Sequence, residues 1–110
     1  MANTSLPGLE VVAERENCCA FVSLSGEMDL ANAAGVEDQI RVLGTSHAMH
    51  LVVDCAELTF IDSSGLNALL TAFRMFGGDL ALVSIGSQMS KLLQVTGLRA
   101  DGDFRYRRWG

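Results

Sequence analysis

Short apolar runs alternate with helix-like apolar stripes in this chain, and this alternation restricts its fold more than any other feature. Leu51-Val52-Val53 is a continuous, β-branched run, typical of a strand covered on both faces. In residues 64–76, apolar side chains recur at helical spacing, and Gly77-Gly78 ends the stripe. Residues 80–83 resemble another buried strand. Because strand and helix patterns alternate from residue 19 onward, we predict α/β layering rather than a bundle or a sandwich.

The first part of the chain adds two strands and a helix. Apolar side chains alternate in residues 9–24, which indicates two strands joined at residues 14–17. The strand run at Leu51 is expected to end near Asp54. Either Asp29 or Asn32 can cap the first helix, whose inward positions are spaced by three and four: Ala33, Val36, Ile40 and Leu43.

The last part of the chain adds one helix and one strand. Ser87 or Ser90 can open the helix, and residues 104–109 alternate apolar with basic side chains, as in a strand with one buried face. No repeat or linker divides the sequence. We therefore predict one domain over residues 9–110, preceded by a loose N-terminal arm at residues 1–8.

The composition excludes several classes of protein. With 110 residues, 49% of them hydrophobic and 19% charged, the chain can bury a core and does not match a disordered protein. The formal net charge of −5 argues against direct binding to nucleic acid. Because no apolar run is long enough to cross a membrane and the N-terminus lacks a signal-peptide pattern, we expect a cytoplasmic protein that does not bind membranes.

The chain contains three cysteines, Cys18, Cys19 and Cys55, without the spacing of a metal site. Adjacent cysteines in a strand point to opposite faces, which makes a bridge between Cys18 and Cys19 awkward. We expect reduced structural thiols, with redox sensing by Cys18 and Cys19 as the alternative.

The motifs of common enzymes are absent from the sequence. A serine-hydrolase elbow needs Gly-x-Ser-x-Gly, whereas residues 61–65 read Ile-Asp-Ser-Ser-Gly. The two histidines, His47 and His50, have no partner at metal-ligand spacing, and there is no glycine-rich phosphate loop. We therefore predict a protein that is not an enzyme and has no catalytic residues, cofactor or metal.

Three consecutive polar residues, Asp62, Ser63 and Ser64, fall where the second helix begins. One of them is needed as the helix cap, which leaves the others for another role. A helix N-terminus favours an added phosphate by about 0.3 to 1 kcal/mol, and by about 2 kcal/mol when the site is partly buried. Repulsion from Asp62 opposes this by roughly 1 to 5 kcal/mol at a separation of about 6 Å. Because the two effects are comparable, phosphorylation is expected to change what this helix end binds without unfolding the domain.

Five motifs occur in a fixed order in the sequence. The most specific is Leu-Thr-Phe-Ile-Asp-Ser-Ser-Gly-Leu at residues 58–66. The weaker ones are Ser25-Gly26-Glu27-Met28-Asp29, Leu51-Val52-Val53-Asp54, Gly77-Gly78-Asp79-Leu80 and Val95-Thr96-Gly97-Leu98. In this order and spacing, over about residues 9–100, the chain resembles the STAS domain of bacterial anti-sigma factor antagonists.

The resemblance implies a STAS fold, with a small mixed β-sheet of four to five strands packed against about three α-helices. In that family a partner that is both an anti-sigma factor and a serine kinase phosphorylates the first serine of Asp-Ser-Ser-Gly. The matching acceptor is Ser63, with Ser64 as its neighbour and helix cap, and the family's Gly-Glu-hydrophobic-Asp turn implies contacts with the kinase. The partner-binding residues implied in this way are Glu27, Asp29, Asp62, Ser63, Ser64 and Gly65.

The resemblance also implies a partner switch. The unphosphorylated protein captures the anti-sigma factor and frees a sigma factor for transcription, and the phosphorylated protein lets go until a PPM-type phosphatase restores it. Family members usually continue into a further C-terminal helix, whereas this sequence ends in an Arg-rich strand pattern. The alternative is a STAS scaffold or accessory subunit, in a stress-signalling assembly or an ABC-type lipid transporter, that binds its neighbour without a switch at Ser63.

Overall fold

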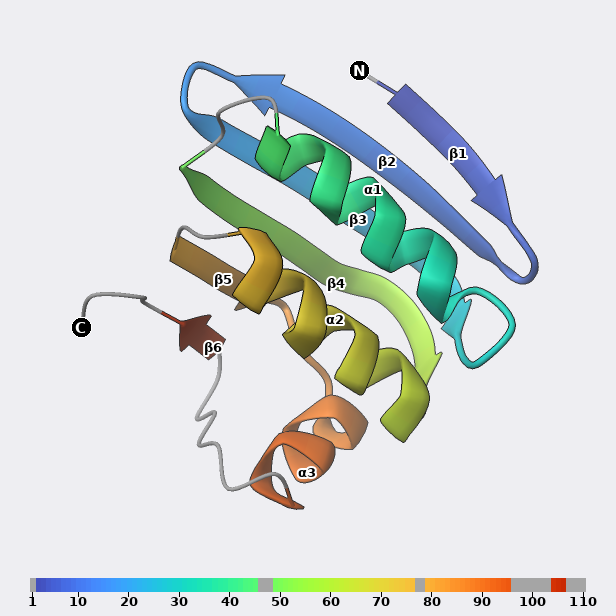
Figure 1. Cartoon of the computed structure of the whole chain (residues 1–110). Coiled ribbons are helices and arrows are strands. Elements are labelled where there is room, and N and C mark those ends of the chain that lie inside the picture. The colour runs from blue at the N-terminus through green and yellow to red at the C-terminus, as the bar shows by residue number, and fades with distance from the viewer. Residues whose placement is uncertain (1, 46–48, 77–78, 96–103, 107–110) are drawn as a thin grey trace.

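The computed structural model describes residues 2–45, 49–76, 79–95 and 104–106, which form one mixed β-sheet with three helices (Figure 1). The elements, in chain order, are β1 (Ala2–Leu6), β2 (Leu9–Glu16), β3 (Cys19–Met28), α1 (Ala33–Thr45), β4 (His50–Ile61), α2 (Ser63–Phe76), β5 (Asp79–Val83), α3 (Ser87–Val95) and β6 (Phe104–Tyr106). This confirms the predicted α/β layering, the alternation and the mixed sheet.

The sheet follows chain order, β1-β2-β3-β4-β5-β6. Strands β3, β4 and β5 are parallel, and the two connections between them are the helices α1 and α2. The other neighbouring pairs are antiparallel. A parallel pair needs a long crossover connection, whereas an antiparallel pair can be joined by a tight turn, so the positions of α1 and α2 follow from the strand directions.

The N-terminal residues form a strand, so the expectation of a loose arm at residues 1–8 is wrong for residues 2–6. Strand β1 pairs with β2 along its whole length, and the Ser5 hydroxyl donates a hydrogen bond of 2.7 Å to Glu10. Leu6 covers Gly35 of α1, where an added Cβ would lie 2.8 Å from Leu6 Cδ2. Strand β6 falls within the strand predicted at residues 104–109, so β1 is the added strand that raises the sheet to six, one more than the upper limit of the prediction.

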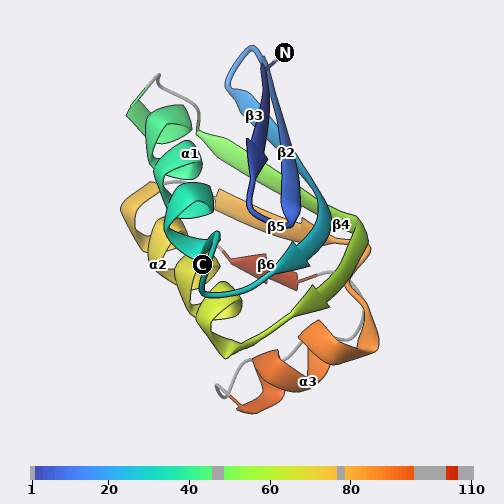
Figure 2. The ribbon, with the colours of Figure 1, turned by 90° about the vertical axis from the view of Figure 1, so that its right-hand side faces the viewer.

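Helices α1 and α2 lie side by side on one face of the sheet, and no described helix covers the opposite face (Figure 2). The predicted inward positions of α1 are confirmed, because Val36 and Ile40 are fully buried and Leu43 packs against the core. The largest fully buried side chains are Leu24, Met28, Ile40, Leu51, Leu69, Leu82, Leu93, Val11, Val22, Val36, Val53 and Asn32.

The uncovered face of the sheet corrects the expectation that the strand at Leu51 is enclosed on both sides. Leu51 and Val53 point into the core, whereas Val52 between them is half-buried. Strand β4 also continues beyond Asp54 to Ile61, because β3 provides pairing partners as far as Met28. We call the uncovered face the open face; strand register places Glu10, Val12, Glu14, Glu16, Phe21, Val52, Asp54 and Asp79 on it.

Asn32, immediately before α1, is the buried polar residue of the described core. Its Nδ2 donates hydrogen bonds to Pro7 O at 2.7 Å and Glu27 O at 2.8 Å, and its Oδ1 accepts one from Asp29 N at 3.0 Å. The side chain of Asn32 does not cap α1, because its hydrogen bonds go to Pro7, Glu27 and Asp29. Asp29 instead accepts from Ala31 N through its carboxylate and from Ala33 N through its carbonyl.

The contact between Leu6 and Gly35 can be tested by mutation. We expect Gly35→Ala to lower the free energy of unfolding by about 1 kcal/mol, because the clash with Leu6 outweighs the gain in helix propensity. In the Leu6→Ala background the same change is expected to be neutral or stabilising. Urea denaturation measures both effects.

Gly86→Ala is the matched control, because a Cβ at Gly86 has no neighbour within 4 Å. Equal effects of Gly35→Ala with and without Leu6 would contradict the packing of β1 on α1.

Candidate functional site

Asp62 caps α2 at the junction between β4 and α2. Its Oδ1 accepts a hydrogen bond from Gly65 N at 2.9 Å, and its carbonyl accepts one from Leu66 N at 3.0 Å. This is the side-chain geometry of an N-cap, in which a carboxylate satisfies an amide of the first helical turn. Of the three polar residues that could cap the helix, Asp62 is the cap. The capping role implied for Ser64 is wrong, because Ser64 is already inside the helix.

Ser63 is the first residue of α2 and is exposed, whereas Ser64 is half-buried. No hydrogen bond joins the Ser63 hydroxyl to another residue in the part of the chain that the structure describes. The free amides at the start of a helix carry partial positive charge, which favours an anion there. The site therefore presents an accessible hydroxyl at a position suited to a negative charge.

Gly65 lets α2 begin directly against the end of β3. A Cβ at this buried position would lie 3.0 Å from each of three atoms, Met28 O, Met28 Cγ and Ile61 Cγ1. The backbone N–H of Asp62 also donates a hydrogen bond of 3.3 Å to Met28 O. The segment around Met28, which carries Glu27 and Asp29, is therefore adjacent to the first turn of α2.

The two acidic residues of this segment differ in their surroundings. Glu27 is exposed, and its side chain is free to meet a partner. Asp29 is half-buried, and one carboxylate oxygen accepts a hydrogen bond of 2.9 Å from Ala31 N. With Asp62, these residues bring three acidic side chains to the two segments that meet at Met28 and the first turn of α2.

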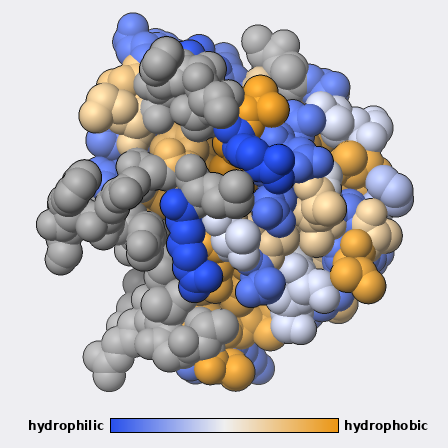
Figure 3. Space-filling view, viewed as in Figure 1, coloured by the Kyte–Doolittle hydropathy of each residue, from blue (hydrophilic) through white to orange (hydrophobic). Residues whose placement is uncertain are grey.

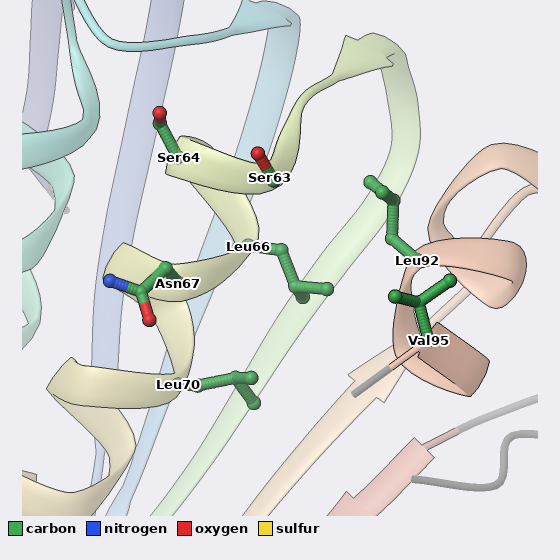
Figure 4. A pocket seen from close by; sticks show the side chains of 7 residues that line it. All are labelled: Ser63, Ser64, Leu66, Asn67, Leu70, Leu92 and Val95. Carbon is green, nitrogen blue, oxygen red and sulfur yellow. The ribbon is translucent and has the colours of Figure 1, made fainter. Parts of the chain in front are cut away.

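A groove of about 450 Å³ lies between α2 and α3 and has the two serines at one end. Figure 4 shows Leu66 and Leu70 pointing from α2 toward α3, where Leu92 and Val95 complete the lining. On the same side of the molecule, apolar residues interrupt the polar surface, including the lower edge over α3 (Figure 3). The groove thus joins an apolar floor to the accessible Ser63 hydroxyl.

Helix α3 is held near this junction by a side chain. Gln88 Oε1 accepts a hydrogen bond of 3.0 Å from Ile61 N, the last residue of β4. The sequence did not reveal this contact or the groove, because both depend on where α3 packs. The only sequence signal was the polar residue at position 88, next to the predicted helix start.

The cysteines lie away from this site, since Cys19 begins β3 and Met28 ends it. All three are free thiols. Partial burial and the neighbouring Cys18 raise the pKa of Cys19, and burial raises the pKa of Cys55 to about 12. A raised pKa lowers the fraction of reactive thiolate at neutral pH. The proposed redox role of Cys18 and Cys19 stays a prediction.

Of the two histidines, the structure describes His50, which lies away from the serine site at the start of β4. His50 opens β4, and its Nδ1 lies 3.5 Å from Asp79 Oδ2, whereas His47 is outside the described residues. Among the residues that the structure describes, no group of three or more His, Cys, Asp or Glu side chains is arranged to hold a metal ion. The helices in the same part of the chain are too short or too polar to cross a membrane.

Known proteins with similar sequences share one description. An anti-sigma-B factor antagonist of Listeria monocytogenes is 27% identical over 90 residues, covering 79% of each protein. An anti-sigma F factor antagonist of Paenibacillus polymyxa is 29% identical over 94 residues, covering 82% of this chain and 80% of the relative.

Solved structures agree with the fold. An anti-sigma factor antagonist from Mycobacterium paratuberculosis superposes with a TM-score of 0.70 at 25% identity, covering 81% of this chain and 78% of the other. The unphosphorylated form of the anti-sigma factor antagonist SpoIIAA gives the same TM-score at 22% identity, covering 80% and 81%. The family model of the STAS domain matches residues 10–105. The chain therefore belongs to the STAS domain family.

Proposed function

We propose that this protein is an anti-sigma factor antagonist that is switched off by phosphorylation at Ser63. The observation that carries the proposal is that one residue caps the start of α2 and another presents an exposed hydroxyl there. Asp62 caps the helix through Gly65 N, which leaves the exposed Ser63 hydroxyl uncommitted. A hydroxyl that the fold does not need can be modified without loss of the fold.

The relatives support this proposal by their descriptions. Those from Listeria monocytogenes and Paenibacillus polymyxa are described as antagonists of anti-sigma factors. SpoIIAA, whose fold this chain shares, has been solved in both an unphosphorylated and a phosphorylated form. A phosphorylatable surface is therefore compatible with this fold.

The physical effect of a phosphate at Ser63 differs between the free protein and a complex. In the free protein the helix N-terminus stabilises an anion by about 0.3 to 1 kcal/mol, while the Asp62 carboxylate repels it. In a complex, the phosphate would be enclosed between two protein surfaces and lose water, which costs several kcal/mol when no cation compensates. Phosphorylation should therefore disrupt binding far more than folding.

The partner in this proposal is an anti-sigma factor with serine kinase activity. It docks over Ser63, contacts Glu27 and Asp29, and inserts an apolar side chain into the groove between Leu70 and Leu92. Binding removes the anti-sigma factor from its sigma factor, and a PPM-type phosphatase reverses the modification. The protein itself acts by binding in the cytoplasm, without catalysis.

The site of phosphorylation can be tested with a kinase-type anti-sigma factor encoded in the same genome. We expect one added phosphate on the wild-type chain in intact-mass measurements and none on Ser63→Ala, because the variant lacks the acceptor oxygen. Ser64→Ala is the matched control and should still be modified. Phosphate on Ser64, or on Ser63→Ala, would show that the acceptor is assigned incorrectly.

Binding should depend on charge at the same position. We expect Ser63→Ala to bind the partner as tightly as the wild type, and Ser63→Asp to bind at least about tenfold more weakly, since a tenfold change is about 1.4 kcal/mol. Isothermal titration calorimetry measures both. Unchanged affinity of Ser63→Asp, with a mass-mapped phosphate that also leaves affinity unchanged, would support the scaffold alternative.

Docking in the groove between α2 and α3 can be tested separately from phosphorylation. Val95 is 86% exposed, so Val95→Ser should barely alter the free energy of unfolding but should weaken partner binding by about 1 to 2 kcal/mol through lost apolar contact. Val42→Ser is the control, because Val42 is 65% exposed on α1 and does not line the groove. Equal affinities of the two variants would argue against apolar docking between α2 and α3.

A further inference from the structure

The amide of Asn32 ties three backbone segments together. The side chain is 1% exposed, and its Nδ2 donates to Pro7 O and to Glu27 O while its Oδ1 accepts from Asp29 N. Only this orientation of the amide matches donors with acceptors, because both carbonyls need an N–H and the Asp29 amide needs an oxygen. Asn32 therefore links the β1–β2 turn to the segment that follows β3.

The same turn touches this segment through its backbone. Glu27 N donates a hydrogen bond of 3.0 Å to Gly8 O. Gly26 has a φ of 115°, and a Cβ there would lie 2.5 Å from Gly8 O, closer than any side chain allows. The turn is thus seated directly against residues 26–29, and glycine at position 26 is required for that approach.

The tied segment lies against the first turn of α2, which carries Ser63. Glu27 is held through both its N–H and its C=O, which fixes the backbone from which its exposed side chain projects. The next residue, Met28, accepts a hydrogen bond from Asp62 N and lies against Gly65. Asp29 is fixed at its own N–H by Asn32. A continuous set of contacts therefore runs from the N-terminal turn to the first turn of α2.

We propose that Asn32 is a positioning residue of the phosphorylation switch, which holds Glu27 and Asp29 beside Ser63 by anchoring them to the β1–β2 turn. This inference rests on the proposed function. Asn32 is buried and does not touch a partner itself. It acts by fixing two acidic residues before the partner arrives, which lowers the entropic cost of forming the complex.

The experiment compares Asn32→Ala and Asn32→Asp with Val36→Ala. Asn32→Asp keeps the size of the side chain and an acceptor for Asp29 N but loses both donors. Val36 is fully buried in α1, the helix that Asn32 precedes, so Val36→Ala destabilises the core without removing a side-chain bond to the segment. Asn32→Asp serves as the second variant should Asn32→Ala fail to fold.

Two measurements are made on each folded variant. Amide hydrogen exchange reports whether Glu27 and Asp29 are held, with Val53 in the core as reference. Steady-state phosphorylation by the anti-sigma kinase gives KM and kcat. For Asn32→Ala we expect exchange at Asp29 to rise about tenfold or more relative to Val53, because its amide loses the Asn32 Oδ1 acceptor. Exchange at Glu27, whose amide donates to Gly8 O, is expected to rise as well, because its carbonyl loses the Asn32 donor that ties it to the turn. For the same variant we expect KM to rise about tenfold while kcat stays within about twofold of the wild type. Val36→Ala is expected to leave unchanged both KM and the exchange of Glu27 and Asp29 relative to Val53.

The outcomes separate the two proposals. If the wild-type chain is phosphorylated at Ser63 but the Asn32 variants match Val36→Ala in KM and in exchange, Asn32 is only a structural residue and the inference is overturned. Faster exchange with an unchanged KM overturns it as well, because loosening the segment would then have no effect on recognition. If the wild-type chain is not phosphorylated, the proposed function fails, and the role of Asn32 in the switch fails with it.

Discussion

The close approach of α2 to the end of β3 is the contact on which the site depends. It is possible because Gly65 has no Cβ, so that the first turn of α2 can rest on Met28. Two register shifts interrupt the pairing of β3 with β4 before this junction, one between Ser23 and Ser25 and one between Gly26 and Glu27. Because the strands and the helix meet here, the segment that carries Glu27 and Asp29 lies next to the helical turn that carries Ser63.

Much of this arrangement could be predicted from local sequence patterns. The apolar stripe of residues 64–76 predicted the bounds of α2 to within one residue, because helical periodicity over such a length is a strong signal. Strand β1 was missed, because Asn3, Thr4 and Ser5 show no apolar alternation and an edge strand needs little of it. Its existence depends on pairing with β2 and on the contact between Leu6 and Gly35, which the sequence does not display.

The predicted residues of the site came from the family resemblance and not from local sequence patterns. Ser63, Glu27 and Asp29 came from a family resemblance, and the fold brings their segments together through Met28. The role of Asn32 was not foreseen, because an asparagine before a helix is an ordinary cap and its partners at Pro7 and Glu27 are set by the tertiary fold. The groove likewise required α3 in place. Residues whose function comes from long-range contacts give no local signal.

The open face has a consequence for behaviour in concentrated solution. Phe21 is 40% exposed there and Val52 is half-buried, a combination that on a neutral sheet would favour stacking of two molecules. On this face the carboxylates of Glu14, Glu16 and Asp54 surround the apolar patch. Two copies brought face to face would oppose like charges within a Debye length of about 8 Å at physiological salt. The acidic rim thus gives colloidal stability to a sheet that its helices cover on only one side.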